Sequence, residues 1–345
     1  MQNIKWLNNL KLSVGYGATG NQSGLDPYKT IQMYGSQGIY YDNGSWLPSF
    51  RISQNANPDL KWEQTNMLNI GLDFSVLGNR LSGRIEWYDK QTTDMLYTYP
   101  VATPPYMYDK MMANVGDMQN RGIELFLNAN VISTKDFSWD ISLNLAHNQN
   151  KITRLSNEAF SAENLLLGSV DIRGGVLGTT HILEEGSPVG QFYGLQATGL
   201  DANGKYIFID KNGDGEISDP ADYNYIGCAQ PKLTYGMTNS FRYKNWDLSF
   251  FFRGTLGNDL INVPRLAYAQ SLFMPGSNAL DDPLTFQLTE TPRFSSMYVE
   301  NGSFLRLDNL TLGYKFNCLN GIRVYLTGQN LFVITKYKGL SLIHI

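Results

Sequence analysis

The chain has 345 residues, a formal net charge of −4 and only 17% charged side chains, so it lacks the basic patches of a nucleic-acid-binding protein. Aromatic residues make up 13%, and the chain has 33 Gly and 21 Tyr. This composition favours β-strands joined by Gly-rich turns over helices. No run of about 18 apolar residues predicts a transmembrane helix, but a membrane-spanning strand needs only about 9–11 residues.

The segment "GYGATG", residues 15–20, has the glycine spacing of a dinucleotide-binding turn. That turn needs a helix directly after it, and Gly24 and Pro27 block one. We therefore expect a strand that runs into a loop. Further along, the apolar residues of 68–76 alternate with polar ones, and "LGNR" links them to a second alternating segment, 81–88. This pattern predicts an antiparallel hairpin.

The same alternation recurs three times. Further hairpins are expected for residues 123–131 with 137–148, 233–243 with 246–254, and 304–316 with 322–332. In the last hairpin the apolar residues change from odd-numbered to even-numbered positions at Asp308–Asn309, which predicts a β-bulge. Long polar stretches lie between the hairpins, at residues 92–117, 150–188 and 257–300.

Short turns that alternate with long loops are typical of an outer-membrane β-barrel. The alternation lasts for about ten residues in several segments, longer than the ~5–6 residues of an average strand. Aromatic side chains near the segment ends fit the girdles of such a barrel: Trp62, Trp87, Tyr88, Trp139, Trp246 and Tyr314. The predicted fold class is all-β, a transmembrane antiparallel β-barrel, with a soluble β-protein as the alternative.

Residues 210–218 read "DKNGDGEIS" and resemble the calcium loop of an EF-hand. The candidate oxygen ligands are Asp210, Asn212, Asp214, Glu216, Asp219 and Asp222. The segment before the loop is strand-like and Pro220 follows it, so the helix pair of a calcium sensor is not expected. Two interpretations stay open: a loop that holds Ca²⁺, or a turn whose side chains cap their own backbone.

Nothing in the sequence points to catalysis. The three histidines, His147, His181 and His344, have no ligand or triad partner at a recognisable spacing. His147 continues the apolar face of its strand and is expected in a girdle. Cys228 and Cys318 share no spacing typical of a disulfide framework or a zinc site. We therefore do not expect an enzyme.

Nine stretches, taken together, resemble the SusC/RagA-type TonB-linked outer-membrane proteins. Each stretch alone is a weak signal, whereas the ordered set covers nearly the whole chain and is specific. The stretches are "LKLSVGYGATGNQ", "NPDLKWEQTNMLNIGLDF", "RLSGRIEWYDKQTTDML", "NVGDMQNRGIEL", "EEGSPVGQFYGLQATGL", "DKNGDGEIS", "GCAQPKLTYGMTNSFRYKNWDLSFFFRG", "NGSFLRLDNLTLGYKF" and "VYLTGQNLFVITKYKGL".

The resemblance implies that residues 1–345 are the C-terminal portion of a ~22-stranded barrel, without the plug domain and the TonB box. Residues 205–225 would carry the calcium-type loop on the extracellular side. Residues 341–345 do not continue the family pattern, and we interpret them as a truncated or foreign tail. We hypothesise that the chain is a barrel fragment, whose open edges would leave unpaired backbone groups in lipid.

By the same resemblance, the protein would import glycans or peptides across the outer membrane of a gram-negative bacterium. Its expected partners are a SusD-like surface lipoprotein, the TonB complex, the transported glycan or peptide, and outer-membrane lipid. No cofactor is implied beyond Ca²⁺ in the 210–222 loop. Two alternatives stay open: a TonB-dependent siderophore or cobalamin receptor, and a soluble calcium-binding carbohydrate-binding or adhesin module.

Overall fold

The structure is a computed structural model, and it describes residues 5–156, 163–170, 178–272, 274–317 and 321–339. The expectations for Cys318 and for the tail at 341–345 lie outside the described residues. Cys228 is a free cysteine. In the described part of the chain, none of the helices is long and apolar enough to span a membrane.

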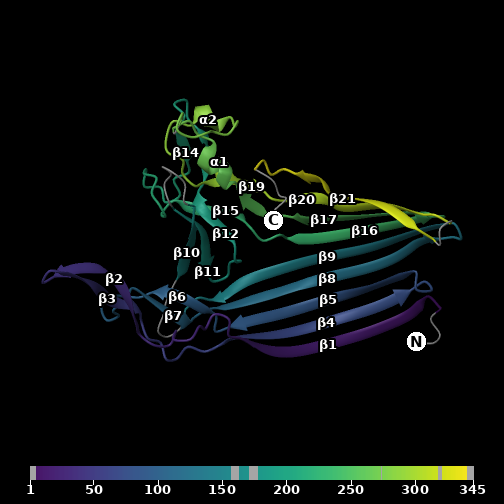
Figure 1. Cartoon of the computed structure of the whole chain (residues 1–345), viewed down its shortest axis with the longest axis horizontal. Helices are drawn as coiled ribbons and strands as arrows, with labels where there is room; N and C mark the ends of the chain where they lie inside the picture. The colour runs from purple at the N-terminus through teal and green to yellow at the C-terminus, as the bar shows by residue number, and fades with distance from the viewer. Residues whose placement is uncertain (1–4, 157–162, 171–177, 273, 318–320, 340–345) are drawn as a thin grey trace.

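Nine long strands pair in one antiparallel sheet within the described part of the chain (Figure 1). In order across the sheet they are β1 (Leu7–Asn21), β4 (Glu63–Val76), β5 (Leu81–Thr93), β8 (Asp117–Ser133), β9 (Phe137–Arg154), β16 (Leu233–Tyr243), β17 (Trp246–Leu256), β20 (Phe304–Lys315) and β21 (Arg323–Thr335). Residues 15–20 lie within β1, as expected. Among these strands β1 and β21 have one partner each, so the sheet is open.

All four predicted hairpins are confirmed, as β4–β5, β8–β9, β16–β17 and β20–β21. Their connections are short because turn residues such as Asn79 and Lys244 adopt a positive φ, at 66° and 51°. The turns at 77–80 and 244–245 lie at one end of the sheet, which we call the short-turn end. The long connections leave from the opposite, long-loop end.

The predicted bulge is also confirmed. Phe251 of β17 lies opposite Asn309, whereas the next residue, Phe252, lies opposite Leu307. Asp308 is therefore an extra residue on β20. Odd-numbered residues before it lie on the apolar face, whereas even-numbered residues after it do.

The long connections contain smaller elements that alternation in the sequence did not predict. Four two-stranded sheets are β2 (Met33–Asp42) with β3 (Ser45–Gln54), β6 (Leu96–Pro100) with β7 (Lys110–Asn114), β13 (Ala197–Leu200) with β14 (Tyr206–Phe208), and β18 (Asp259–Ile261) with β19 (Val299–Asn301). A four-stranded sheet has the order β10 (Asn164–Ser169), β11 (Thr179–Glu184), β12 (Gln191–Leu195) and β15 (Tyr223–Cys228). Short helical segments are α1 (Val263–Tyr268), α2 (Leu284–Gln287) and the 3₁₀ turn η1 (Ser296–Tyr298).

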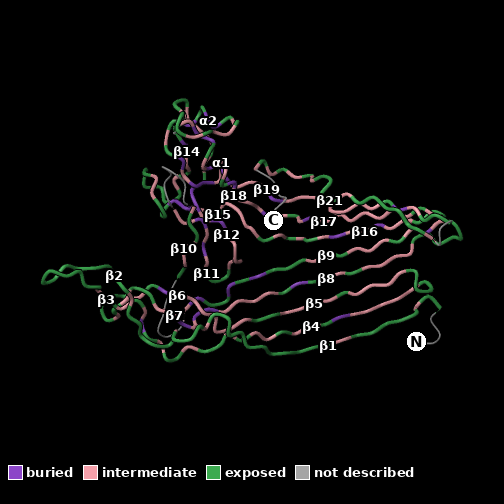
Figure 2. The backbone as a smooth tube through the Cα atoms, viewed as in Figure 1, coloured by how far each residue is buried: buried purple, intermediate pink, exposed green. Residues whose placement is uncertain are grey.

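The main hydrophobic core lies beyond the long-loop end, in residues 190–230 and 259–301, which we call the loop lobe (Figure 2). Its buried residues are Tyr206, Leu266, Ala269, Leu284, Leu288, Phe294 and Tyr298. The hydroxyls of Tyr206 and Tyr298 are 2.6 Å apart and satisfy each other inside this core. The described residues of the polar stretch 257–300 thus form a folded part of the protein and not a loose loop.

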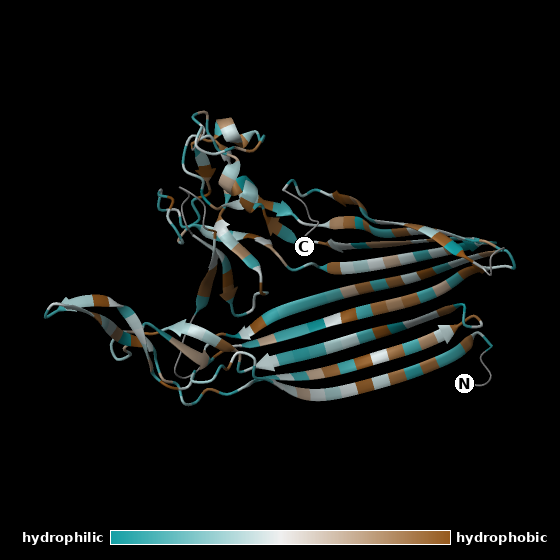
Figure 3. Ribbon diagram, viewed as in Figure 1, coloured by the Kyte–Doolittle hydropathy of each residue, from teal (hydrophilic) through white to brown (hydrophobic). Residues whose placement is uncertain are grey.

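The large sheet has one apolar and one polar face, as the alternation of colour along each strand in Figure 3 shows. Leu72 on β4, Ile85 on β5 and Leu125 on β8 lie opposite one another on the apolar face. Many side chains of this face are exposed, including Leu12, Val14 and Leu326. An apolar face left open to its surroundings is what a strand in contact with lipid requires.

Most of the predicted girdle residues in β5, β9, β17 and β20 do lie on the apolar face. At the short-turn end Trp139 stacks on Phe241, and the rings of Trp246 and Tyr314 are 4.7 Å apart. The prediction is wrong for Tyr88. That residue alternates with Trp87, so it points to the polar face, where its hydroxyl donates to Asn148.

Tyrosine rings cover glycines on both faces of the sheet. Tyr88 lies over Gly122 on the polar face, and a Cβ added to Gly122 would be 2.6 Å from the Tyr88 hydroxyl. Tyr235 lies over Gly254 on the apolar face, and its hydroxyl donates to the Phe304 carbonyl at 3.1 Å. Such aromatic cover compensates for the missing side chain of a strand glycine.

This packing predicts that Gly122→Ala destabilises the full-length protein. The new Cβ would be 2.5 Å from the His147 backbone carbonyl, which cannot move aside as a side chain can. The overpacking should lower the free energy of unfolding by about 1–3 kcal/mol and reduce the apparent Tm measured by far-UV circular dichroism. Gly17→Ala is the control, because no described atom lies within 4 Å of its added Cβ. Equal Tm values for the two variants would contradict the packing.

Candidate functional site

A charged cluster lies on the polar face of β4 and β5. Arg84 Nε is 2.6 Å from a Glu86 carboxylate oxygen, and Arg84 Nη1 is 3.6 Å from Asp73. Asn69 donates to the other oxygen of Glu86. These side chains meet because Asp73 lies opposite Arg84 and because residues two apart share a strand face. Half-exposed pairs of this kind add little stability, about 0–1 kcal/mol, so their main effect is to fix a charge pattern on this face.

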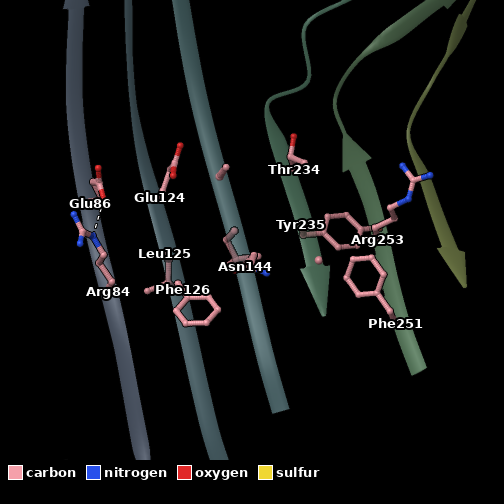
Figure 4. Close-up of a pocket in the computed structure, with 13 residues that line it drawn as sticks. Arg84, Glu86, Glu124, Leu125, Phe126, Asn144, Thr234, Tyr235, Phe251 and Arg253 are labelled. Atoms are coloured by element: carbon pink, nitrogen blue, oxygen red, sulfur yellow. Dashed lines mark hydrogen bonds and ion pairs between the residues drawn. The ribbon is translucent and has the colours of Figure 1, made fainter. Parts of the chain in front are cut away.

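A hollow of about 380 Å³ lies beside this cluster, across β5, β8, β9, β16 and β17 (Figure 4). The rings of Phe126 and Phe251 occupy its middle, between Arg84 on one side and Arg253 on the other. Asn144 adds an amide group. Aromatic rings and an amide between fixed charges can bind a polar ligand.

The bulge contributes to a second hollow on the same face. Asp308 lies 2.8 Å from Arg253 Nε, and both line a space of about 290 Å³ with Arg306, Asn309 and Gln329. Because Asp308 is an extra residue in β20, its carboxylate can reach the polar face between Arg306 and Asn309. The polar face therefore offers fixed charges and amides from β4 to β21.

The calcium-type loop lies in the loop lobe, between β14 and β15. The strand predicted before the loop is confirmed as β14, whereas β15 after it was not predicted. The Asp210 carboxylate accepts hydrogen bonds from the backbone N–H groups of Gly213 and Gly215, at 2.6 and 2.8 Å. Asn212 Oδ1 accepts from the Asp214 N–H, and Asp214 Oδ1 accepts from the Glu216 N–H. These are the bonds expected of a turn whose side chains cap their own backbone.

The two remaining candidate ligands have other partners. Asp222 is fully buried, and its carboxylate accepts from the N–H groups of Ser218, Lys211 and Asn212. The hydrogen bond from Ser218, followed by those from Lys211 and Asn212, holds the pKa of Asp222 below its usual value. Asp219 pairs with Arg293 at 2.9 Å.

Calcium binding by this loop stays a prediction. In the described part of the chain, no three or more His, Cys, Asp and Glu side chains form a group that could hold a metal ion. Asp210, Asn212 and Asp214 nevertheless present exposed or half-exposed oxygens within one tight loop. Asn and backbone oxygens are ordinary Ca²⁺ ligands, and a carboxylate oxygen can accept an N–H and bind the ion at once.

Comparison with known proteins identifies the scaffold. Residues 3–331 match the family described as TonB dependent receptor-like, beta-barrel. The chain belongs to this family. The resemblance read from the nine sequence stretches is thereby confirmed, together with the all-β antiparallel fold.

Two curated receptors and one solved structure show how similar the chain is to its relatives and how much of their length it covers. It is 35% identical over 99% of its length to TonB-dependent receptor SusC of Bacteroides thetaiotaomicron, and covers 36% of that protein. It is 32% identical over 95% of its length to TonB-dependent receptor P3 of Formosa agariphila, and covers 35% of it. The solved structure of the RagAB peptide transporter superimposes with a TM-score of 0.78 at 29% identity, over 98% of this chain and 38% of that one. The chain thus spans little more than a third of these relatives.

The buried carboxylate predicts an acid-sensitive loop. The folded-state pKa of Asp222 is lowered, so its contribution is complete above the unfolded value of about 4 and is lost as pH falls through the folded pKa. Asp222→Asn should speed proteolytic cleavage of residues 210–222 at neutral pH roughly tenfold, because an amide NH₂ then faces backbone donors. Limited proteolysis with mass spectrometry measures this rate.

The matched control is Asp201→Asn in the neighbouring turn, which keeps one oxygen for the Asn203 and Lys205 N–H groups and is not among the candidate Ca²⁺ ligands. Its cleavage rate should stay near that of the wild type. Wild-type cleavage that does not change between about pH 6 and about pH 3 would contradict the role of the Asp222 carboxylate.

For calcium, we propose that Asp210, Asn212, Asp214 and the Glu216 carbonyl bind the ion, with a carboxylate from Asp219 or Asp222 completing the set. Calorimetric titration of the full-length protein with Ca²⁺ should show saturable heat, and Asp214→Ala should weaken affinity about tenfold or more. Asp201→Ala is the control, because Asp201 caps the neighbouring turn through Asn203 and Lys205. No saturable heat from the wild type would overturn the proposal.

Proposed function

We propose that this chain is part of the β-barrel of a TonB-dependent receptor of the outer membrane, which imports glycans or peptides with a SusD-like surface lipoprotein. The similarity to SusC and to the RagAB peptide transporter supports this proposal, because it extends over 99% and 98% of the chain. It includes the loop lobe as well as the sheet. A soluble adhesin or carbohydrate-binding module does not agree with this family membership.

The geometry of the sheet fits that function. Strands β16 and β17 have 11 residues each, and a tilted strand needs about 9–11 to cross the hydrocarbon layer. The apolar face would contact lipid, and the polar face would line the lumen. Substrates would then meet the Phe126 and Phe251 rings and the charge pattern around Arg84. We further propose that the receptor moves its substrate without bond chemistry.

The long-loop end is where we propose that the lipoprotein binds. It carries the loop lobe and the β2–β3 hairpin, which projects beyond the sheet (Figure 1). One face of that hairpin has Tyr41 opposite Trp46 and Ile39 opposite Pro48, without a charged side chain. Trp46 is 65% exposed, and aromatic residues are enriched in protein–protein interfaces.

Deletion of the gene that encodes the full-length receptor tests the proposal. The deletion strain should fail to grow on one glycan or peptide source, and a plasmid copy should restore growth. Uptake of that substrate in a fluorescent form gives the direct measurement. Growth under iron limitation and on vitamin B12 should remain normal. Loss of growth confined to iron or cobalamin limitation would instead identify a siderophore or cobalamin receptor.

A further inference from the structure

The hollow between Phe126 and Phe251 has a floor of small side chains. Asn144 of β9 lies opposite Gly236 of β16. On one side of this floor, Phe126 of β8 lies opposite Asn144. On the other side, the Phe251 ring of β17 leans over Gly236, 3.2 Å from a Cβ added there. The two rings and the floor between them form a slot on the polar face (Figure 4).

The slot combines apolar walls with a polar floor. Phe126 is 41% exposed, although the residues two positions before and after it, Glu124 and Asn128, are polar. Aromatic walls with a few placed polar groups are typical of ligand sites. Asn144 is exposed in the floor, and its amide can donate to a carbonyl and accept from an N–H group. These are the two polar groups of a peptide unit.

One flank of the slot carries carboxylates that repel each other. Glu124 of β8 lies directly opposite Glu86 of β5, and like charges in this position are destabilising. Arg84 pairs with Glu86 at 2.6 Å. The ion pairs between described residues do not include Glu124, which is exposed at the rim. A cationic group of a ligand would remove the repulsion.

The opposite flank carries a guanidinium group. Figure 4 shows Arg253 across the slot from Glu124, beside the Phe251 ring. Asp308 accepts a hydrogen bond from Arg253 Nε at 2.8 Å. A guanidinium also has two NH₂ groups, which can bind a further carboxylate. The Arg253 side chain is 38% exposed, so a ligand can reach it.

The distance between the flanks indicates the length of the ligand. Three strand spacings separate β8 from β17, or about 14 Å. An extended peptide of about four residues spans at most ~14 Å. At neutral pH its termini carry one positive and one negative charge, so it matches both flanks at once. A neutral glycan of that length would leave the repulsion between Glu86 and Glu124 in place.

The pairing of the strands determines how such a peptide would lie. Strands β8, β9, β16 and β17 each have a partner on both sides, so a peptide cannot join them as a further strand. It would instead lie across the strands and be recognised by side chains.

We propose that this slot binds a short peptide with free termini, its ammonium group at Glu124 and its carboxylate at Arg253. Apolar side chains of the peptide would contact the two phenylalanine rings, and Asn144 would bind a peptide group. The inference rests on the proposed import function and narrows its substrate from glycans or peptides to peptides.

Equilibrium dialysis of the full-length receptor against a mixture of tetrapeptides tests the inference, with mass spectrometry to quantify the bound peptides. The mixture is used with free termini, with acetylated N-termini and with amidated C-termini. The wild type should concentrate the free peptides. Each blocked terminus should weaken binding about tenfold, because it removes a charge-assisted contact. A wild-type receptor that does not concentrate the free tetrapeptides overturns the inference.

Two variants assign the termini. Glu124→Gln should bind free and N-acetylated peptides equally well and still prefer a free carboxylate. Arg253→Gln should bind free and C-amidated peptides equally well and still prefer a free amino group. Heat-modifiable gel mobility shows whether each variant is folded. The Glu124→Gln result decides by itself, because no ion pair of the described residues is lost. An unchanged preference for a free N-terminus in Glu124→Gln refutes the assignment.

Matched controls remove charges elsewhere on the same face. Asp140→Asn and Arg242→Gln change exposed residues near the short-turn end. Both should keep the wild-type preferences for free termini. If either control loses a preference as the slot variants do, the overall charge of the face selects the peptide and the inference is wrong.

A photoreactive side chain reports what occupies the slot. Phe126→benzoylphenylalanine in the full-length receptor should crosslink to a bound tetrapeptide on irradiation. If it crosslinks instead to another part of the receptor, whether or not peptide is present, the slot is a contact between domains and the inference is wrong.

Failure of this inference can be told from failure of the proposed function. A receptor whose deletion abolishes growth on a glycan, and which binds no tetrapeptide, refutes only the peptide slot. A deletion that affects growth only under iron or cobalamin limitation refutes the proposed function and this inference with it.

Discussion

Continuous backbone pairing is the interaction on which the rest of this structure depends. In lipid no water can satisfy an N–H or C=O group, so a membrane sheet must pair each strand along its whole length. The strands from β1 to β21 form one continuous ladder with local bulges, in which β1 and β21 each have one described partner. Because that pairing fixes the register, it also fixes which side chains share a face. The apolar and polar faces, and the charge pattern around Arg84, follow from it.

Local departures from regular pairing produce the specific features of each face. At Asp308 an extra residue lets a carboxylate reach Arg253, and so adds a charge pair to the polar face. At Gly122 and Gly254 a missing side chain makes room for a tyrosine ring. The same pairing of a glycine with a tyrosine ring has different results on the two faces. Over Gly122 the tyrosine hydroxyl makes a polar contact with Asn148. Near Gly254 the tyrosine leaves a hollow among apolar side chains.

The sequence predicted those parts of the fold that depend on near neighbours. Alternation has a period of two residues, so the four hairpins and the shift at Asp308 could be read directly. Tyr88 shows that residue type and position near a segment end do not suffice to predict a girdle residue. It is aromatic and near such an end, but it alternates with Trp87 and therefore lies on the polar face. The segment "GKYIFI" predicted the strand before the calcium-type loop, which is β14, whereas nothing in the sequence predicted β15 after Pro220.

The loop lobe could not be predicted in the same way. Its core joins Tyr206 to Leu266, Leu284 and Tyr298, which are distant in sequence and lie in short elements without a sustained period. The hollow between Phe126 and Phe251 is equally non-local, since it needs the register of five strands. Contacts between residues distant in sequence stabilise these short elements, and local sequence patterns do not predict such contacts.

The β2–β3 hairpin also bears on how far the sheet depends on an unbroken chain. Its tip, Asn43–Gly44, is exposed and projects far from the paired strands, as sites of proteolytic nicking commonly do. A cut there would separate β1 from β4 covalently, yet the two strands are paired from Asn21 opposite Glu63 to Leu10 opposite Phe74. The nicked protein would remain a two-piece assembly held by main-chain hydrogen bonds. Its two pieces would part only in denaturant.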